Sequence, residues 1–575
     1  MDAPSDWAIE RSYFDAFGHA NAVAAEDFAH LAECLGGDSG RAAGPLVPDA
    51  PPQAFQPGFA VAGERRWVLA VQLYAVRSRR NWGHGDFTDL KNLLGIAAEL
   101  GAAGVGVNPL HALAEGQASP YSPSSRLFLN PVYIDLDAVP EFDGGTTDEI
   151  ERLRGLDTVD YPGVWAAKLE ALRAAYGRLH DPARLAAFAA FRRERGEALA
   201  RFAAFETLKR RYGLPWQDWP AEWRRPSKAA LTALRDAEPA EIEFHEYVQW
   251  LADDQLHACR EHARALGLPV GLYLDLAVGV DCGGADAWAD QAALAPGLSI
   301  GAPPDLWNPA GQDWGIASFH PQVLIDTDFA LFRHTLRAVM RHAGAVRIDH
   351  ALGLNRLFLI PQGRGAKHGA YVRFPFRAML AVLAQESVAA RCLVIGEDLG
   401  TVPEGVSETL RAGGVWSYRV ALFERWDDGS FRQPDQYPAQ AIVTFSTHDL
   451  PTFAGWMTEH DIAVKRGIGL DPGEGGQARG EARARLREAL AWQGIHSEGE
   501  MTFTDVSRFL ARTPCGLLAV PIEDALGVVD QVNVPGTVTE HPNWLRRLPI
   551  KLEDWTARKD IQSLASALRA EGRGI

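Results

Sequence analysis

The sequence lacks the features that mark membrane-spanning proteins, secreted proteins, and proteins stabilised by disulfides or zinc. None of its 575 residues belong to an uninterrupted apolar run of 18 or more, the length that a spanning helix needs. The first 18 residues carry acidic side chains where a signal peptide has a basic region and an apolar core. Its five cysteines include no C-x-x-C pair, which argues against a disulfide framework or a zinc site. We therefore expect a cytoplasmic protein that does not associate with membranes.

Positive charge is also scarce. The chain has 57 Lys and Arg against 74 Asp and Glu, a formal net charge of −17. Nucleic acids and anionic membrane surfaces bind basic patches, so neither is an expected partner. The sequence contains no H-E-x-x-H, no correctly spaced G-x-G-x-x-G, no phosphate-binding G-x-x-x-x-G-K-[ST] and no G-x-S-x-G. We expect no metal and no cofactor.

What the sequence does contain is a series of short apolar runs, most of them separated by helix-length segments. Parallel strands buried on both faces give such continuous runs. Eight of them favour a closed (β/α)8 barrel, an α/β fold, over an open sheet. The runs cover residues 67–76, 104–110, 269–278, 345–352, 392–399, 415–423, 441–450 and 516–526.

The uneven spacing of the runs predicts insertions into the barrel. Residues 1–65 are expected to form an N-terminal appendage and linker, and residues 66–575 the catalytic barrel. About 160 residues separate the second and third runs, too many for one connection, and 140–265 is rich in helix-forming residues. We expect a helical insertion at 140–265, an active-site loop at 278–321 and a second insertion at 455–510.

Three carboxylates follow the ends of predicted strands: Asp349, Glu397 and Asp449. In a barrel these ends share one mouth, and converging carboxylates suit glycosyl transfer, with one attacking carboxylate and one proton donor. Arg347, two residues before Asp349, faces the same side and would keep that carboxylate ionised. Burial and the neighbouring Asp398 are expected to raise the pKa of Glu397.

Other interpretations of these residues remain open. A single aspartate at a strand end is often a helix cap or an ion-pair partner, and strand-end carboxylates with histidine also bind divalent metals. His448, beside Asp449, is a candidate donor to a sugar hydroxyl.

Aromatic residues in polar loops point to the same kind of ligand. The chain has 17 tryptophans, and Trp307 and Trp314 lie among Gly, Pro, Asp and Gln, while Tyr121 lies between prolines. Sugar rings pack their C–H faces on aromatic rings. A partly buried structural tryptophan is the alternative in each case.

At these residues the sequence resembles the amylomaltases, the 4-α-glucanotransferases related to the α-amylase clan. The resemblance runs from about residue 67 to 548. It rests on several long motifs: NWGHGDFTDL (81–90), SPYSPSSRLFLNPVYID (119–135), GLYLDLAVGVD (271–281), VRIDHALGL (346–354), IGEDLGTVP (395–403), FSTHDLPTFAGW (445–456) and PIEDALG (521–527) with QVNVPGT (531–537).

The resemblance implies a role for each candidate. Asp349 would be the nucleophile that forms a covalent glucosyl-enzyme, Glu397 the general acid/base, and Asp449 the carboxylate that holds sugar hydroxyls. The substrate-contacting positions would be Tyr121, Asp275, Trp314, Arg347 and His448. It also implies a barrel with no C-terminal β-sandwich.

The implied partners are α-1,4-glucans and maltooligosaccharides, with glucose as an acceptor. Two other hypotheses remain: an α-glucan hydrolase of the same clan, and a non-catalytic glucan-binding protein.

Overall fold

A computed structural model describes residues 6–14, 19–40, 52–304, 311–497 and 499–575. Its centre is a closed barrel of eight parallel strands, which confirms the predicted fold. Each predicted apolar run contains one strand. In chain order they are β5 (Arg66–Val71), β6 (Gly104–Val107), β9 (Gly271–Leu276), β13 (Ala345–Ile348), β16 (Leu393–Gly396), β17 (Trp416–Val420), β18 (Ala441–Thr444) and β19 (Leu517–Pro521).

The barrel interior is packed with side chains. Tyr273, Ile395, Trp416 and Leu517 belong to one buried cluster inside it. Gly106 is required beside them, because a Cβ at this position would lie 2.7 Å from the ring of Tyr273. The barrel therefore has a solid core, and the space for a ligand is left to its mouth.

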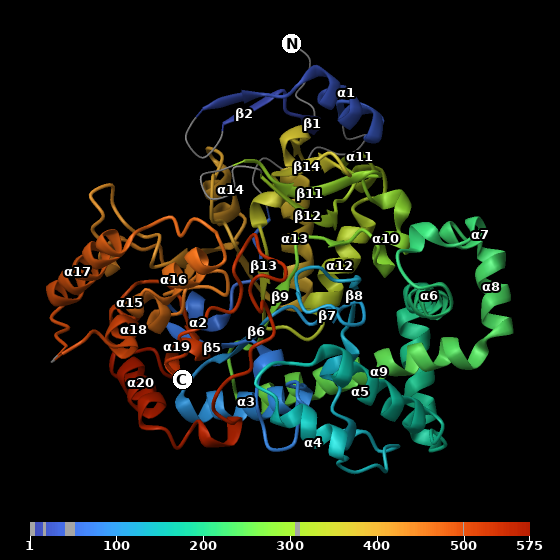
Figure 1. Cartoon of the computed structure of the whole chain (residues 1–575), viewed down its shortest axis with the longest axis horizontal. Coiled ribbons are helices and arrows are strands. Elements are labelled where there is room, and N and C mark those ends of the chain that lie inside the picture. The colour runs from blue at the N-terminus through green and yellow to red at the C-terminus, as the bar shows by residue number, and fades with distance from the viewer. Residues whose placement is uncertain (1–5, 15–18, 41–51, 305–310, 498) are drawn as a thin grey trace.

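Helices cover the outside of the barrel, as Figure 1 shows. Their apolar faces are buried against the strands, the arrangement expected of crossover helices. They are α3 (Phe87–Leu100), α9 (Pro239–Ala265), α12 (Ala330–Met340), α13 (Phe376–Ala390), α14 (Val406–Ala412), α18 (Phe503–Ala511) and α20 (Lys559–Ala570). Among the described residues, no helix is long and apolar enough to cross a membrane.

Two groups of helices interrupt the barrel and lie on opposite sides of it in Figure 1. The first contains α4 (Asp148–Gly155), α5 (Tyr161–Tyr176), α6 (Pro182–Tyr212), α7 (Ala221–Arg224) and α8 (Lys228–Ala237), and leads into α9. The second contains α15 (Phe453–Thr458), α16 (His460–Gly467) and α17 (Gly476–Trp492), and leads into α18. Trp219 and Trp250 are buried in the first group.

The region expected as a loop at 278–321 contains regular structure. Its elements are β10 (Val280–Asp281), α10 (Ala285–Ala289), β11 (Leu298–Ala302) and β12 (Gln312–Ala317). Their strands belong to a seven-stranded sheet with the order β10-β12-β11-β14-β15-β1-β4. The sheet forms because β11 pairs with β14 (Arg356–Pro361), and β14 with β15 (Ala370–Arg373), both from the segment after β13.

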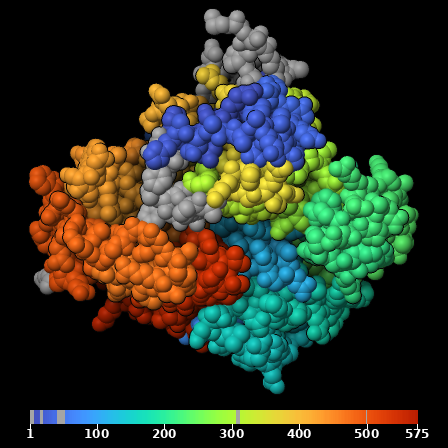
Figure 2. Space-filling view, turned by 45° about the horizontal axis from the view of Figure 1, so that its top comes forward, coloured from blue at the N-terminus to red at the C-terminus, as the bar shows by residue number. Residues whose placement is uncertain are grey.

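The N-terminal residues complete this sheet. β1 (Trp7–Ile9) pairs with β15, and β4 (Ser39–Gly40) pairs with β1, in both cases antiparallel. Figure 2 shows these residues in blue beside the yellow segment that contains β14 and β15. The indole N–H of Trp7 donates to the side chain of Gln322, 2.8 Å away. Residues 7–9 are therefore built into the sheet next to the barrel.

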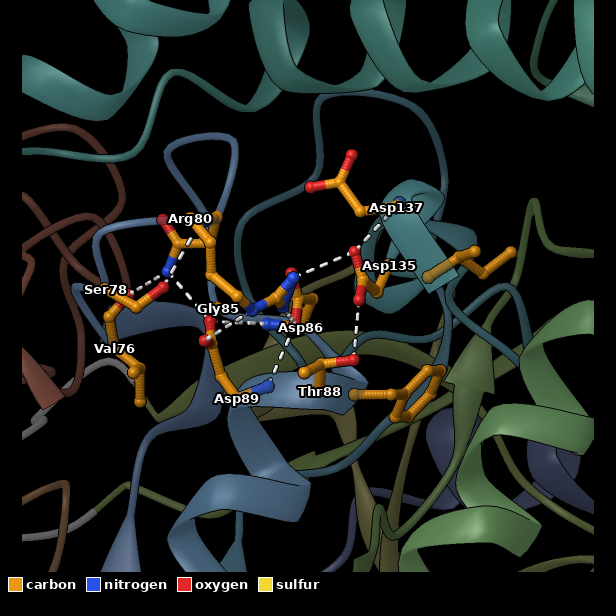
Figure 3. Close-up of polar contacts among 12 residues, drawn as sticks. Val76, Ser78, Arg80, Gly85, Asp86, Thr88, Asp89, Asp135 and Asp137 are labelled. Carbon is orange, nitrogen blue, oxygen red and sulfur yellow. Dashed lines mark hydrogen bonds and ion pairs between the residues drawn. The ribbon is translucent and has the colours of Figure 1, made fainter. Parts of the chain in front are cut away.

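Residues of the motif NWGHGDFTDL join Arg80 and Asp135 in a charged cluster, drawn in Figure 3. Arg80 contacts Asp86 and lies 2.9 Å from Asp135. Asp86 and Asp89 form a capping box at the start of α3, and Thr88 donates to Asp135 over 2.6 Å. This motif thus ties α3 to the segment around Asp135.

Candidate functional site

Arg347 contacts two carboxylates at the barrel mouth, those of Asp275 and Asp349. It lies on β13 in register with Asp275 of β9. Its Nη1 lies 3.0 Å from both carboxylate oxygens of Asp275, and its Nη2 lies 2.8 Å from Oδ1 of Asp349. Asp349 follows directly after β13, so the two-residue spacing places it on the same side of the strand as Arg347. One guanidinium thus joins two carboxylates.

Tyr121 contacts this cluster from the segment between β7 (His111–Ala112) and β8 (Ser125–Leu129), two short strands that follow β6. Its hydroxyl donates to Oδ2 of Asp275 over 2.7 Å. Its ring stacks on His448, with the centroids 4.8 Å apart and an angle of 27°. Burial, with the charge of Asp275, raises the pKa of Tyr121 well above its ordinary value, so the phenol remains a hydrogen-bond donor.

His448 and Asp449 form an ion pair in the loop after β18. His448 Nε2 lies 3.2 Å from Asp449 Oδ2, and Asn533 Nδ2 donates to Asp449 Oδ1 over 2.6 Å. Burial opposes the charged forms of both residues, but their mutual attraction outweighs it. The pKa of His448 is raised and that of Asp449 lowered. Asp449 is therefore an anion with one oxygen fixed by an amide.

Glu397 has different surroundings. The backbone N–H groups of His350 and Leu399 donate to its two oxygens over 2.9 and 3.0 Å. Burial is the largest cause that raises the pKa of Glu397 to about 7, and the charge of Asp349 adds to it while Arg347 opposes it. The expectation that Asp398 supplies the like charge was wrong. Asp398 Oδ1 instead accepts from the backbone N–H of Tyr418, over 3.0 Å.

The backbone at His350, whose N–H donates to Glu397, has an unusual conformation. Its φ of 47° lies in the left-handed region, which non-glycine residues seldom adopt. The His350 ring meets Trp314 of β12 edge-on, with the centroids 5.8 Å apart. The second sheet thus brings Trp314 to the mouth, whereas Trp307 lies outside the described residues.

Two residues at the site were not predicted as functional. Asn533 lies in the segment after β19, and only the fold brings it to Asp449. Glu523 lies two residues after β19, in α19 (Ile522–Ala525), and lines a cavity of about 90 Å³ together with Asp275, Arg347 and His448. Burial raises the pKa of Glu523 to about 7. Its place after a strand end was a signal in the sequence, the same one that identified Asp349.

These residues supply the groups that glycosidic-bond chemistry uses. A carboxylate is held by a guanidinium, a buried carboxyl group is half protonated near neutral pH, and an anion is available to sugar hydroxyls. Within the described part of the chain, no cluster of three or more His, Cys, Asp or Glu residues is arranged to hold a metal. The fold and the site define a barrel enzyme of the glycoside-processing class.

Comparison with known proteins gives the family. A family model described as 4-alpha-glucanotransferase matches residues 71–552, and the chain belongs to this family. The 4-alpha-glucanotransferase of Mycobacterium tuberculosis is 39% identical over 547 residues, covering 89% of this chain and 76% of that protein. The enzyme of Haemophilus influenzae is 35% identical over 542 residues, covering 87% and 77%.

Solved structures agree with the sequence comparison. The amylomaltase of Corynebacterium glutamicum matches with a TM-score of 0.80 at 29% identity, over 99% of this chain and 87% of that one. The amylomaltase of Streptococcus agalactiae, solved in complex with acarbose, shares the fold, with a TM-score of 0.76 at 20% identity over 89% and 100% of the two chains. The chain is thus a 4-α-glucanotransferase, as the resemblance in the sequence implied.

Proposed function

We propose that the enzyme cuts an α-1,4-glucan and transfers the segment to the 4-hydroxyl of another glucan or of glucose, with retention at the anomeric carbon. An oxygen of Asp349 attacks this carbon while the bond to the leaving glucan breaks. Glu397 gives its proton to the leaving oxygen. The acceptor hydroxyl then loses its proton to Glu397 and attacks the same carbon, which releases Asp349.

The observation that carries this proposal is the contrast between the two carboxyl groups. Asp349 is paired with the guanidinium of Arg347 at 2.8 Å, while Glu397 is buried, with a pKa raised to about 7. One is suited to attack and the other to hold a proton. We assign the holding of sugar hydroxyls to Asp449 and His448, and contacts with the sugar to Tyr121 and Trp314.

A trapping experiment tests the nucleophile directly. Glu397→Gln is incubated with an α-maltosyl fluoride, whose leaving group needs no proton donor. Asp349 is expected to gain a maltosyl group that persists, because the base for the second step is missing. Intact-protein and peptide mass spectrometry should find the label at Asp349, and the double variant with Asp349→Asn should carry none. Labelling elsewhere would overturn the assignment.

Product analysis separates transfer from hydrolysis. With maltotriose, a transferase yields both longer and shorter oligosaccharides, whereas a hydrolase of the same clan yields only shorter ones. A non-catalytic glucan-binding protein would yield neither. Transfer requires the covalent intermediate to be shielded from water. The proposed mechanism uses no metal, so the product ladder should persist in a chelator.

We also propose the cytoplasm as the location. All five cysteines are free thiols, three of them buried, which is the state expected in a reducing compartment.

A further inference from the structure

Two exposed tryptophans lie outside the barrel mouth, Trp426 in the segment after β17 and Trp492 at the end of α17 in the second helical group. Trp426 is 49% exposed and Trp492 is 81% exposed, and no other tryptophan in the described part of the chain is more than about a third exposed. Others, such as Trp67, Trp456 and Trp555, are fully buried. A ring this large gains most from removal from water, so two exposed rings in one region call for a partner.

Trp426 is held in place by a hairpin that follows β17. Its backbone N–H donates to Ser430 over 2.8 Å, and the N–H of Arg432 donates to Glu424 over 2.9 Å. Side chains alternate along the hairpin, so Phe431 is buried on one face. On the other face the guanidinium of Arg432 lies 4.7 Å from the centre of the Trp426 ring. The ring is therefore pre-positioned.

A hydrogen bond joins the hairpin to the end of α17. Gln493 Nε2 donates to Gln433 Oε1 over 2.9 Å. Gln433 follows Arg432 in the chain, and Gln493 follows Trp492, the last residue of α17. Trp426, Arg432, Gln433, Gln493 and Trp492 therefore lie in one region of the molecule, where the bond between Gln433 and Gln493 links the hairpin of one exposed ring to the helix end of the other. We call these five residues the aromatic strip.

Its chemistry matches a neutral polymer of sugars. Aromatic rings pack on the C–H faces of glucose units, and the amide and guanidinium groups between them bind hydroxyls. The hairpin also leaves the barrel at the catalytic end of β17, which lies between β16, followed by Glu397, and β18, which precedes Asp449. Figure 1 places α17 at the edge of the molecule, beyond α15 and α16.

We propose that the aromatic strip is a second glucan-binding site, outside the catalytic centre, that holds a long α-1,4-glucan chain. This inference rests on the proposed use of α-1,4-glucans as substrates. Two rings separated by three polar residues need an oligosaccharide of several glucose units to contact both. The strip should therefore strengthen the binding of amylose and glycogen. It should not change the rate of transfer with maltotriose.

The test is the double variant Trp426→Ala/Trp492→Ala. The matched control is Phe14→Ala, which removes an exposed aromatic ring outside the strip. Phe14 is 65% exposed and lies on β2 (Ser12–Phe14), near the N-terminus. Retardation in native gels that contain glycogen measures binding to the polymer. Loss of both rings is expected to weaken this binding by about tenfold, since about 1.4 kcal/mol is a factor of ten. The rate of transfer with maltotriose should stay at the wild-type value.

A second double variant tests whether aromatic rings, and not tryptophan in particular, are needed for binding. Trp426→Phe/Trp492→Phe, which keeps a ring at each position, should restore most of the retardation. Unchanged retardation of the alanine variant, or an equal loss of activity with maltotriose and amylose, would overturn the proposal. So would light scattering that shows the variant converting a dimer into a monomer, because the strip would then be a contact between copies. Failure of the proposed function looks different, since the wild type itself would form no ladder from maltotriose.

Discussion

The raised pKa of Glu397 has a cost in stability that can be measured. Burial and Asp349 raise this pKa from 4.5 to about 7 in the folded enzyme. The folded state then holds the proton more tightly than the unfolded state, so stability falls as the pH rises through this window. At about 1.4 kcal/mol for each pKa unit, the free energy of unfolding falls by about 3 kcal/mol once the pH has risen above both pKa values.

The variant Glu397→Gln removes this loss because an amide does not ionise. Its oxygen accepts from only one of the two N–H groups, of His350 and Leu399, that bind the carboxylate. That penalty, about 1–3 kcal/mol, is the same at every pH. The quantity to compare is therefore the stability of the variant relative to wild type, which should rise by about 3 kcal/mol between pH 5 and pH 8.

Thermal unfolding followed at both pH values gives the assay. A chain of this length has an unfolding entropy of about 1.2 kcal/mol per kelvin, so the expected relative gain in Tm is about 2–3 °C. Other buried carboxyl groups are common to both proteins and cancel. Glu408→Gln, the same substitution at an exposed position of α14, is the control. A Tm difference between variant and wild type that does not change with pH would refute the burial argument.

Four further outcomes are expected. Asp349→Asn should lower kcat with maltotriose by several orders of magnitude at an unchanged fold, judged by circular dichroism. The wild-type transfer rate should fall about tenfold per pH unit above pH 7, as Glu397 loses its proton, and a flat profile to pH 9 would exclude it as the acid. Asn533→Ala should lower kcat/KM about tenfold or more by removing a hydrogen bond to the Asp449 anion. Arg80→Met should cost about 3–5 kcal/mol by leaving Asp86 unpaired, seen as a lower Tm with normal activity of the folded fraction.

The barrel could be predicted because its strands obey a simple rule. A strand covered on both faces is mostly apolar, so each of the eight lies in a mainly apolar run, such as the one that begins Ala-Ile-Val at residue 441. The second sheet obeys no such rule. β1 has three residues and β4 two, and each is defined by its partner: β1 by β15, more than 350 residues away. Short antiparallel strands among Gly and Pro therefore looked like a loop.

The site could be predicted in part for a similar reason. Strand ends point to one mouth, so Asp349 and Glu397 were expected to converge, and both lie close to Arg347. Asn533 could not be found this way, because it belongs to an irregular segment whose path depends on the whole fold. Glu523 could have been found by the strand-end rule, which applies to β19 as it does to β13.

What no pattern of residue types reveals is why two similar carboxyl groups differ. The spacing of Arg347 and Asp349 predicts their contact, because alternate residues share a side of a strand. Glu397 lies in the same mouth, yet its partners are two backbone N–H groups, those of His350 and Leu399. A neutral N–H stabilises a carboxylate less than a guanidinium does, so at Glu397 burial outweighs its two N–H partners and raises the pKa. The difference between the two carboxyl groups thus depends on the partners that the fold brings to each, a guanidinium at Asp349 and backbone N–H groups at Glu397.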